Sequence, residues 1–213
     1  MLGTTAGGEL GDERRSLRRA TLSFRQTLSE QEMVAWSNVI QASALEVVRA
    51  LDTRLMHCYL DFRSEVRTRG LIASLLADGR EVVVPVVRMV DGEEVMRMSR
   101  IQDLTDLRHG AYGIDEPSTE DFESTERVEL AFMPLAAFDQ FGMRLGYGKG
   151  FYDKFLASVP HVLAVGLAFS VQELPRIPRQ EHDQLLDLVI TEEAIIECSP
   201  RGRALMSKIR STR

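Results

Sequence analysis

Apolar residues near the start of the chain follow a helical period. Within residues 13–28 they recur every three or four positions, at Leu17, Ala20, Phe24 and Leu28. This spacing puts them on one face and predicts an amphipathic helix. Ser29 and Glu32 then match a capping box, in which the serine caps the next helix and the glutamate reaches back. The sequence therefore predicts a second helix that runs to about residue 51.

Beyond these helices the pattern changes to short apolar runs of strand length. The runs are LMHCYLDF (55–62), EVVVPVVRMV (81–90), VELAFMPLAAF (128–138), VLAVGLAF (162–169) and LLDLVIT (185–191). Pro85 predicts an edge position or a bulge, because proline lacks an amide hydrogen. Asp91 and Gly92 form a turn signal, after which a further strand is expected to pair as a hairpin. The polar stretch over residues 102–127 is predicted to be a loop.

Helices are expected between several of these runs. Ser64 is a candidate cap for a helix that ends near Ala77, and later helices are predicted over residues 151–158 and 203–209. Apolar strands that alternate with helices are typical of a parallel sheet covered on both faces. The predicted fold is therefore α/β, a mainly parallel sheet in three α/β/α layers with an N-terminal helical pair. We expect one domain over residues 1–213, with a flexible tail at residues 1–12.

Composition narrows the function classes. The chain has 213 residues, of which 44% are hydrophobic and 27% charged, and its net charge is −6. A general nucleic-acid or membrane-surface binder would usually carry a basic footprint, so neither partner is expected and any anion site must be local. No apolar run is long enough to span a bilayer, and the N-terminus lacks the apolar centre of a secretory signal. We expect a monomeric, cytoplasmic protein.

Cysteine and histidine positions give no sign of a disulfide or zinc scaffold. Cys58 lies in an apolar run, which is typical of a buried free thiol, and Cys58 with Cys198 does not make a disulfide framework. The histidines lack metal-ligand spacing: His57, His109, His161 and His182. A structural zinc site is therefore not expected.

The stretch RLGYGKGFYDKF, residues 144–155, concentrates positive charge and little side-chain bulk at one predicted turn. Its alternating glycines are expected to allow positive φ angles and close backbone approach: Gly146, Gly148 and Gly150. Successive amide groups followed by a helix N-terminus form an anion nest. Arg144 can fork onto phosphate oxygens, and Lys149 adds a mobile charge. These features suit a triphosphate; a tight structural turn with solvated charges is the alternative.

Two familiar phosphate motifs do not match this stretch. The Walker A pattern fails because Gly142 is one residue too far from the Gly-Lys pair and Gly150 replaces the hydroxyl residue. The dinucleotide pattern fails because Phe151 stands at the third glycine position. Asp153 lies just beyond the loop, where an acid is either a magnesium ligand or a partner of the helix dipole.

The longer segment FDQFGMRLGYGKGFYDKFL, residues 138–156, resembles the signature of the 5-formyltetrahydrofolate cyclo-ligase family, also called methenyltetrahydrofolate synthetases. Other segments resemble the family in the expected order: LRRATLSFRQTLSEQE, YLDFRSEVRTRGLIASLLADGREVVVPVV, YGIDEP, LAVGLAF and HDQLLDLVIT. The resemblance implies conversion of 5-formyltetrahydrofolate to 5,10-methenyltetrahydrofolate with ATP and Mg²⁺, releasing ADP and phosphate. In that reaction the formyl oxygen attacks the γ-phosphate and nitrogen 10 closes the ring. The implied partners are small molecules, ATP and a reduced folate.

The same resemblance implies roles for matched residues. ATP would be bound by Arg14, Arg18, Arg144, Leu145, Gly146, Tyr147, Gly148, Lys149, Gly150, Phe151 and Tyr152. The catalytic residues would be Arg144, Lys149 and Tyr152, and the folate would be bound by Leu60, Glu65 and Tyr152. Mg²⁺ would be held by Asp153 and Asp183.

Each role has a structural alternative. A helix face shared by several arginines is otherwise a solvated basic surface: Arg14, Arg18 and Arg25. Glu65 is otherwise an acid in the first turn of a helix, Asp183 an acid at a strand entry, and Tyr152 a core residue.

The chain departs from the family pattern at several positions. The mild departures are Arg14 for lysine, Phe151 for tyrosine, Lys154 for arginine and Tyr112 for phenylalanine. Arg67 stands where an acid is common and is expected to reverse a charge near Glu65. The alternative functions are a sugar-phosphate isomerase or CoA-transferase-like enzyme on a similar scaffold, and a non-catalytic nucleotide- or folate-binding relative.

Overall fold

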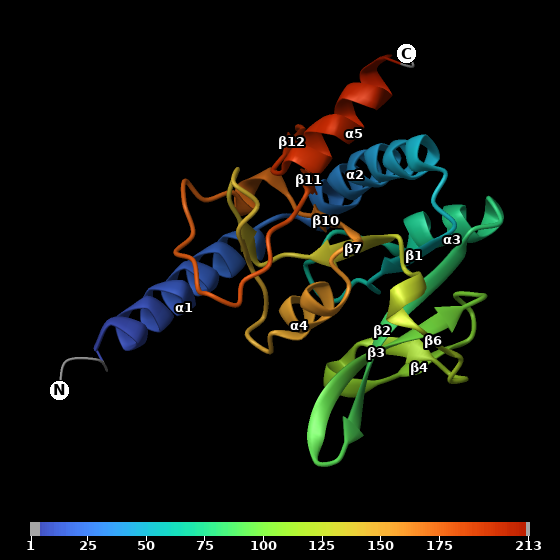
Figure 1. The fold of residues 1–213 in the computed structure, drawn as a ribbon, viewed down its shortest axis with the longest axis horizontal. Helices are drawn as coiled ribbons and strands as arrows, with labels where there is room; N and C mark the ends of the chain where they lie inside the picture. Colours follow the sequence, from blue (N-terminus) through green and yellow to red (C-terminus); the bar gives the residue numbers. More distant parts are fainter. Residues whose placement is uncertain (1–4, 212–213) are drawn as a thin grey trace.

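A single large sheet organises the chain. The computed structural model describes residues 5–211 (Figure 1). Its centre is an eight-stranded sheet in the order β12-β11-β10-β7-β1-β2-β3-β6. Neighbouring strands from β11 to β2 run parallel, whereas β12, β3 and β6 pair antiparallel towards the two edges. The predicted mainly parallel α/β sheet is confirmed.

Helices and strands follow the predicted order, with extra short strands. The helices are α1 (Thr5–Arg25), α2 (Glu30–Leu51), α3 (Arg69–Ala77), α4 (Phe151–Ser158) and α5 (Pro200–Ser211). The strands are β1 (Leu55–Cys58), β2 (Glu81–Val90), β3 (Glu93–Ile101), β4 (Leu107–His109), β5 (Asp115–Pro117), β6 (Phe122–Glu123), β7 (Leu130–Pro134), β8 (Ala137–Phe138), β9 (Arg144–Leu145), β10 (Leu163–Leu167), β11 (Leu188–Ile190) and β12 (Ile195–Glu197). β4 pairs with β5 and β8 pairs with β9, each outside the large sheet.

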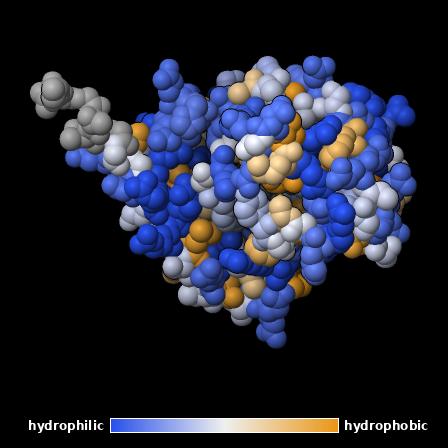
Figure 2. Space-filling view, turned by 90° about the horizontal axis from the view of Figure 1, so that it is seen from below, coloured by the Kyte–Doolittle hydropathy of each residue, from blue (hydrophilic) through white to orange (hydrophobic). Residues whose placement is uncertain are grey.

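Helices cover both faces of the sheet. Successive side chains of a strand point to opposite faces, so a strand that is apolar throughout needs a helix on each side. Met56 and Cys58 of β1 lie in the core shared with α2, α3 and α5, whereas Leu55 lies in the core closed by Phe155 and Leu156 of α4. The face shown in Figure 2 is mainly hydrophilic, with apolar side chains in small groups. No helix in the described part of the chain is both long and apolar enough to cross a membrane.

The two N-terminal helices differ in how they begin and in what they pack against. α2 begins at the predicted capping box, where Ser29 and Glu32 exchange hydrogen bonds with each other's backbone N–H. α1 packs Leu17 and Leu22 on a small apolar cluster that includes Leu145 of β9. Residues 5–12, expected in a flexible tail, form the first turns of α1, and the rest of that tail lies outside the described residues. α1 therefore borders the glycine-rich loop that follows β9.

The boundaries predicted after β1 are wrong. Ser64 caps no helix, because α3 begins at Arg69, and β1 ends earlier than its apolar run. The carboxylate of Asp61 accepts hydrogen bonds from the backbone N–H groups of Thr68 and Arg69, which are unpaired at a helix start. Residues 59–68 therefore form an irregular loop at the end of a central strand, where parallel sheets bind ligands.

Other elements differ in detail. The polar stretch predicted as a loop carries β4, β5 and β6, the apolar run over residues 128–138 is divided between β7 and β8, and β12 was not predicted. The hairpin of β2 and β3 is confirmed. Pro85 lies within β2 beyond the three residues that pair with β1, so its missing N–H interrupts no bond to that neighbour.

Candidate active site

The glycine-rich loop joins β9 to α4 and turns through two glycines in the left-handed region. Gly148 has φ +95° and Gly150 has φ +68°, where a side chain would be strained. Gly146 does not have a positive φ, so the prediction is wrong for that glycine. No described backbone carbonyl accepts a hydrogen bond from the N–H groups of residues 148–153. These groups and the N-terminus of α4 form an open amide array that suits an anion.

Two arginines on one face of α1 contact distant segments: Arg18 contacts the glycine-rich loop, and Arg14 contacts the segment before β11. Arg14 forms a bidentate ion pair with Asp183, with Nη1–Oδ2 and Nη2–Oδ1 distances of 2.6 Å and 2.9 Å. Arg18 donates from Nε to the carbonyl of Gly146 at 2.6 Å. Burial, together with the nearby Arg14, lowers the pKa of Arg18. The shared face is therefore not a solvated basic surface, because both arginines are used in contacts with distant segments.

Arg144 places a fixed positive charge at the base of the loop. Its side chain is nearly buried, with the residue 6% exposed. Nη2 donates to Asp153 Oδ1 at 2.9 Å, and Nη1 donates to the carbonyl of Gln184. Burial lowers the pKa of Arg144, and Asp153 opposes that effect, but a guanidinium keeps its charge in proteins. The charge therefore sits beside the open amide array.

A cavity of about 450 Å³ adjoins the loop. The loop contributes Tyr147, Lys149, Gly150, Phe151 and Tyr152 to its wall, and the segment after β1 contributes Leu60 and Glu65. The structure thus brings part of the nucleotide-matched set and the whole folate-matched set to one cavity. The other candidates do not line it: Arg14, Arg18, Arg144, Leu145, Gly146, Gly148, Asp153 and Asp183. The Leu145 side chain is fully buried, so any ligand contact there is made by its backbone.

The rest of the cavity wall was not predicted from the sequence. β2 and β3 contribute apolar side chains, among them Val86 and Met96, and Arg25 and Arg63 contribute positive charge. A largely apolar cavity with a few fixed polar groups is typical of small-molecule sites. The signal for Arg25 was present, since it shares the helix face of Arg14, but its sequence position did not reveal the cavity.

Glu65 lines the cavity and is 7% exposed. Its Oε2 accepts the N–H of Phe62 at 3.0 Å, and its carboxylate is hydrogen-bonded to the hydroxyl of Tyr147. Arg25, which is 4% exposed, donates to the same hydroxyl at 3.1 Å. Burial raises the pKa of Glu65, against smaller opposing effects of Tyr147, Phe62 and Arg25. Tyr147 is 48% exposed as a whole residue, and its hydroxyl lies between the carboxylate of Glu65 and the guanidinium of Arg25.

Stability is expected to depend on pH through Glu65. The folded-state pKa of this acid is raised above 4.5, so the folded chain binds the proton more tightly than the unfolded chain. The free energy of unfolding should be highest below that value and fall as pH rises through the raised pKa. Thermal unfolding of wild type and Glu65→Gln is measured from about pH 5 to about pH 8. As pH rises, the stability of the wild type should fall relative to that of the variant. A difference that stays constant would contradict the raised pKa.

Lys149 links the loop to β3. Its Nζ lies 2.9 Å from Glu94 Oε2 and 5.3 Å from the centroid of the Tyr112 ring. The hydroxyl of Tyr112 donates to the same carboxylate, and the hydrogen bond with Glu94 is the largest cause of the raised pKa of Lys149. Exposed ion pairs contribute little to stability, so this lysine can exchange Glu94 for another anion at small cost.

Arg67 does not reverse a charge beside Glu65, so that prediction is wrong. Its Nη2 donates to both carboxylate oxygens of Glu30 at 3.0 Å, and its Nη1 lies 3.4 Å from Asp61. These acids neutralise it, and it does not line the cavity. The replacement therefore affects packing against α2 rather than the candidate ligand site.

The carboxylates predicted as metal ligands are paired with arginines. The described residues contain no group of three or more metal-ligating side chains. Asp153 uses Oδ1 for Arg144 and for the N–H of Gln184, whereas Asp183 uses both oxygens for Arg14. Mg²⁺ is commonly held by one or two carboxylates together with phosphate oxygens. In this structure Asp153 keeps one carboxylate oxygen outside these pairs, whereas both oxygens of Asp183 are taken by Arg14.

Known proteins are similar to this chain in sequence and in fold. The model of the 5-formyltetrahydrofolate cyclo-ligase family matches residues 11–192. The 5-formyltetrahydrofolate cyclo-ligase of Haemophilus influenzae is 26% identical, over 84% of this chain and 97% of the relative. That of Mus musculus is also 26% identical, over 85% and 94%. The NMR structure of Aquifex aeolicus 5,10-methenyltetrahydrofolate synthetase is similar with a TM-score of 0.76 and 30% identity, covering 87% of this chain and 92% of that one. The chain belongs to the 5-formyltetrahydrofolate cyclo-ligase family.

Proposed function

We propose that the glycine-rich loop binds the triphosphate of ATP while the adjoining cavity binds the pterin of 5-formyltetrahydrofolate. As a cyclo-ligase, the protein converts 5-formyltetrahydrofolate to 5,10-methenyltetrahydrofolate with ATP as co-substrate. One observation carries the assignment of the two sites: the loop residues Lys149 and Tyr152 line the same cavity as Leu60 and Glu65. Two substrates bound in this way would meet at the loop.

The reaction asks for positioning and charge neutralisation more than for covalent chemistry. The formyl oxygen attacks the γ-phosphorus, and the bridging oxygen leaves with ADP. Nitrogen 10 then adds to the activated carbon and loses its proton, and the former formyl oxygen leaves with phosphate. We assign Arg144 and Lys149 to the developing charge on the phosphoryl group, and Tyr152 to orientation of the folate. Lys149 would give up its exposed pair with Glu94 for this purpose.

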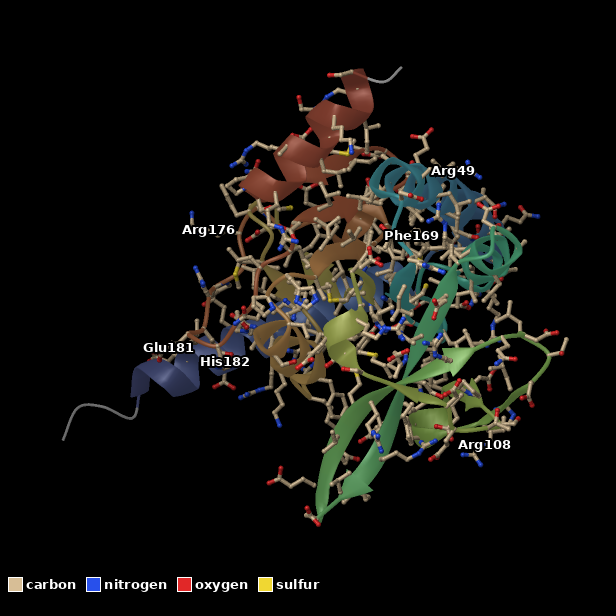
Figure 3. The ribbon with its side chains drawn as sticks, turned by 45° about the vertical axis from the view of Figure 1, so that its right-hand side comes forward. Arg49, Arg108, Phe169, Arg176, Glu181 and His182 are labelled. Atoms are coloured by element: carbon tan, nitrogen blue, oxygen red, sulfur yellow. The ribbon has the colours of Figure 1, made fainter. Side chains whose placement is uncertain are left out.

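The arginines of α1 are proposed to bind the remaining phosphate charge. Arg18 is already hydrogen-bonded to the loop backbone, and Arg14 lies on the same face. A second cavity, of about 470 Å³, is lined by their chain neighbour Glu13 and by Met143 and Arg176. Of these residues, Arg176 is labelled in Figure 3. We propose that this cavity accepts the nucleoside, because it adjoins the residues that would hold the phosphates.

We propose Asp153 as the protein ligand of Mg²⁺, with Asp183 as a second carboxylate. The cation, when bound, supplies positive charge that neutralises the triphosphate. Asp153 supports this role because it lies at the end of the loop and keeps one carboxylate oxygen out of its pairs with Arg144 and Gln184. Asp183 would first exchange Arg14, whose guanidinium prefers a bidentate anion and would find one in the triphosphate.

Direct turnover tests the proposal. Purified protein is mixed with 5-formyltetrahydrofolate and Mg²⁺, with and without ATP, and the absorbance of methenyltetrahydrofolate is followed. Product that forms only with ATP supports the assignment. Folded protein that binds ATP but forms no product would favour a non-catalytic relative. Folded protein that turns over a sugar phosphate or a CoA ester, and does not bind ATP, would favour the isomerase or transferase alternative.

Gly148→Ala is expected to weaken ATP binding about tenfold, because strain at a positive φ costs about 1–3 kcal/mol. The Gly148 backbone has φ +95°, so an alanine there would distort the loop. Gly146→Ala is the matched control, since its φ is not positive and an added Cβ meets nothing within 4 Å. Calorimetric titration with ATP compares the two purified variants. Equal affinities would show that the loop conformation does not govern binding.

We also propose that the protein acts as a cytoplasmic monomer with one domain. Cys58 and Cys198 are free thiols, which agrees with a reducing compartment. Light scattering at assay concentrations checks the oligomeric state.

A further inference from the structure

His57 is a fully buried histidine at the centre of the parallel sheet. It lies on β1 between Val83 of β2 and Ala131 of β7, and it is 0% exposed. Its Nε2 lies 3.1 Å from the hydroxyl oxygen of Tyr152. Its Nδ1 is buried without a hydrogen-bond partner in the described part of the chain. One edge of the ring is therefore connected to the candidate active site and the other edge is not satisfied.

An unsatisfied buried nitrogen destabilises a fold, so packing does not explain this residue. The cluster on this side of the sheet consists of apolar side chains, among them Val83, Ala131 and Phe155. An apolar residue would fill the position without leaving a polar atom unpaired. The hydroxyl of Tyr152, which lines the cavity, is the side-chain group within hydrogen-bond distance of the imidazole. That contact accounts for a polar side chain at this place.

We infer that His57 is a positioning residue for Tyr152, whose hydroxyl it holds in one orientation towards the folate in the cavity. The inference rests on the folate-binding role proposed for Tyr152. The rings of the two residues are tilted by 52° with centroids 5.6 Å apart, so the tyrosine is fixed both by packing and by one hydrogen bond. Without His57 the hydroxyl would lose its partner inside the protein and could rotate.

The charge state of the pair supports orientation rather than proton transfer. Burial lowers the pKa of His57 to about 3, against a smaller opposing effect of the Val83 backbone. Burial is also the largest cause of the strongly raised pKa of Tyr152. Both groups are therefore neutral at the pH of an enzyme assay. A neutral imidazole has one donor nitrogen and one acceptor nitrogen. Its Nε2 can therefore hydrogen-bond the phenol hydroxyl of Tyr152 without placing a charge beside it.

His57→Leu removes the hydrogen bond and keeps similar volume, whereas His57→Gln carries a polar atom near the position of Nε2. We expect His57→Leu to lower kcat with 5-formyltetrahydrofolate about tenfold, which is the effect of one hydrogen bond. KM for ATP should not change, and His57→Gln should recover part of the loss. In the Tyr152→Phe background, His57→Leu should cause no further loss. Additive losses in the double variant would overturn the inference.

The same variants separate this inference from the proposed function. Loss of activity in Tyr152→Phe with wild-type activity in His57→Leu would reject the role of His57 and keep that of Tyr152. Wild-type activity in Tyr152→Phe would reject both. Long-range ¹H–¹⁵N spectra of the wild-type histidines supply a test without any variant. We expect His57 to stay neutral at about pH 5 and its Nε2 signal to shift when 5-formyltetrahydrofolate is added. An Nε2 signal unchanged by the folate would contradict the inference.

Discussion

Arg144→Ala is expected to lower kcat/KM for ATP about 1,000-fold while the fold remains intact. Arg144 supplies a nearly buried positive charge at the base of the glycine-rich loop, 2.9 Å from Asp153. Its removal deletes a charge that would neutralise the phosphoryl group. It also leaves the carboxylate of Asp153 uncompensated beside the loop that we propose for the triphosphate. The two effects act in the same direction, so the loss should exceed that of one neutral hydrogen bond.

Steady-state formation of methenyltetrahydrofolate measures this loss, and circular dichroism checks the fold. Arg144→Lys keeps the charge but not the fork, so we expect a smaller loss, about 10- to 100-fold. Arg203→Ala is the charge-matched control, because Arg203 is exposed on α5 and lines neither cavity. Turnover of Arg144→Ala at the wild-type rate, with the usual dependence on ATP, would remove Arg144 from the phosphate site.

Local signals were sufficient for the elements that depend on local chemistry. The capping box of Ser29 and Glu32 formed as predicted, because both partners lie within one helical turn. The β2–β3 hairpin followed from an apolar run and a turn signal. The glycine-rich loop was located correctly because glycine spacing and basic charge coincide there. Its conformation was not fully predicted, since the alternating glycines do not share one φ region.

The remainder of the site depends on contacts between distant parts of the chain. Arg25 and Tyr147 are 122 positions apart, and Arg14 and Asp183 are 169 positions apart. No local pattern predicts such pairs, so the sequence did not show that the basic face of α1 contacts distant segments and that Arg25 lines the cavity. The start of α3 was missed for a related reason. The N–H groups at its start donate hydrogen bonds to the carboxylate of Asp61, which lies several residues upstream of the usual capping position.

Glu65→Gln is expected to weaken binding of 5-formyltetrahydrofolate about 30-fold, which is the worth of a hydrogen bond to a charged group. ATP affinity should change by less than about threefold. Glu65 lines the cavity and is 7% exposed, so a ligand that reaches it meets a carboxylate with little access to water. Such a group accepts hydrogen bonds from the N–H groups of a reduced pterin. The amide keeps the shape but loses the charge that makes those bonds strong.

Separate titrations with the folate and with ATP measure the two affinities, and Glu193→Gln, on an exposed turn before β12, is the control. Tyr147 joins Glu65 to Arg25 and also belongs to the loop, so a loss could reach the nucleotide through it. Tyr147→Phe separates these routes, because it cuts the link and leaves the carboxylate in place. If Glu65 binds the folate itself, Tyr147→Phe should cost less folate affinity than Glu65→Gln. Equal losses of folate and ATP affinity in Glu65→Gln would instead mean that Glu65 supports the loop and that another group recognises the pterin.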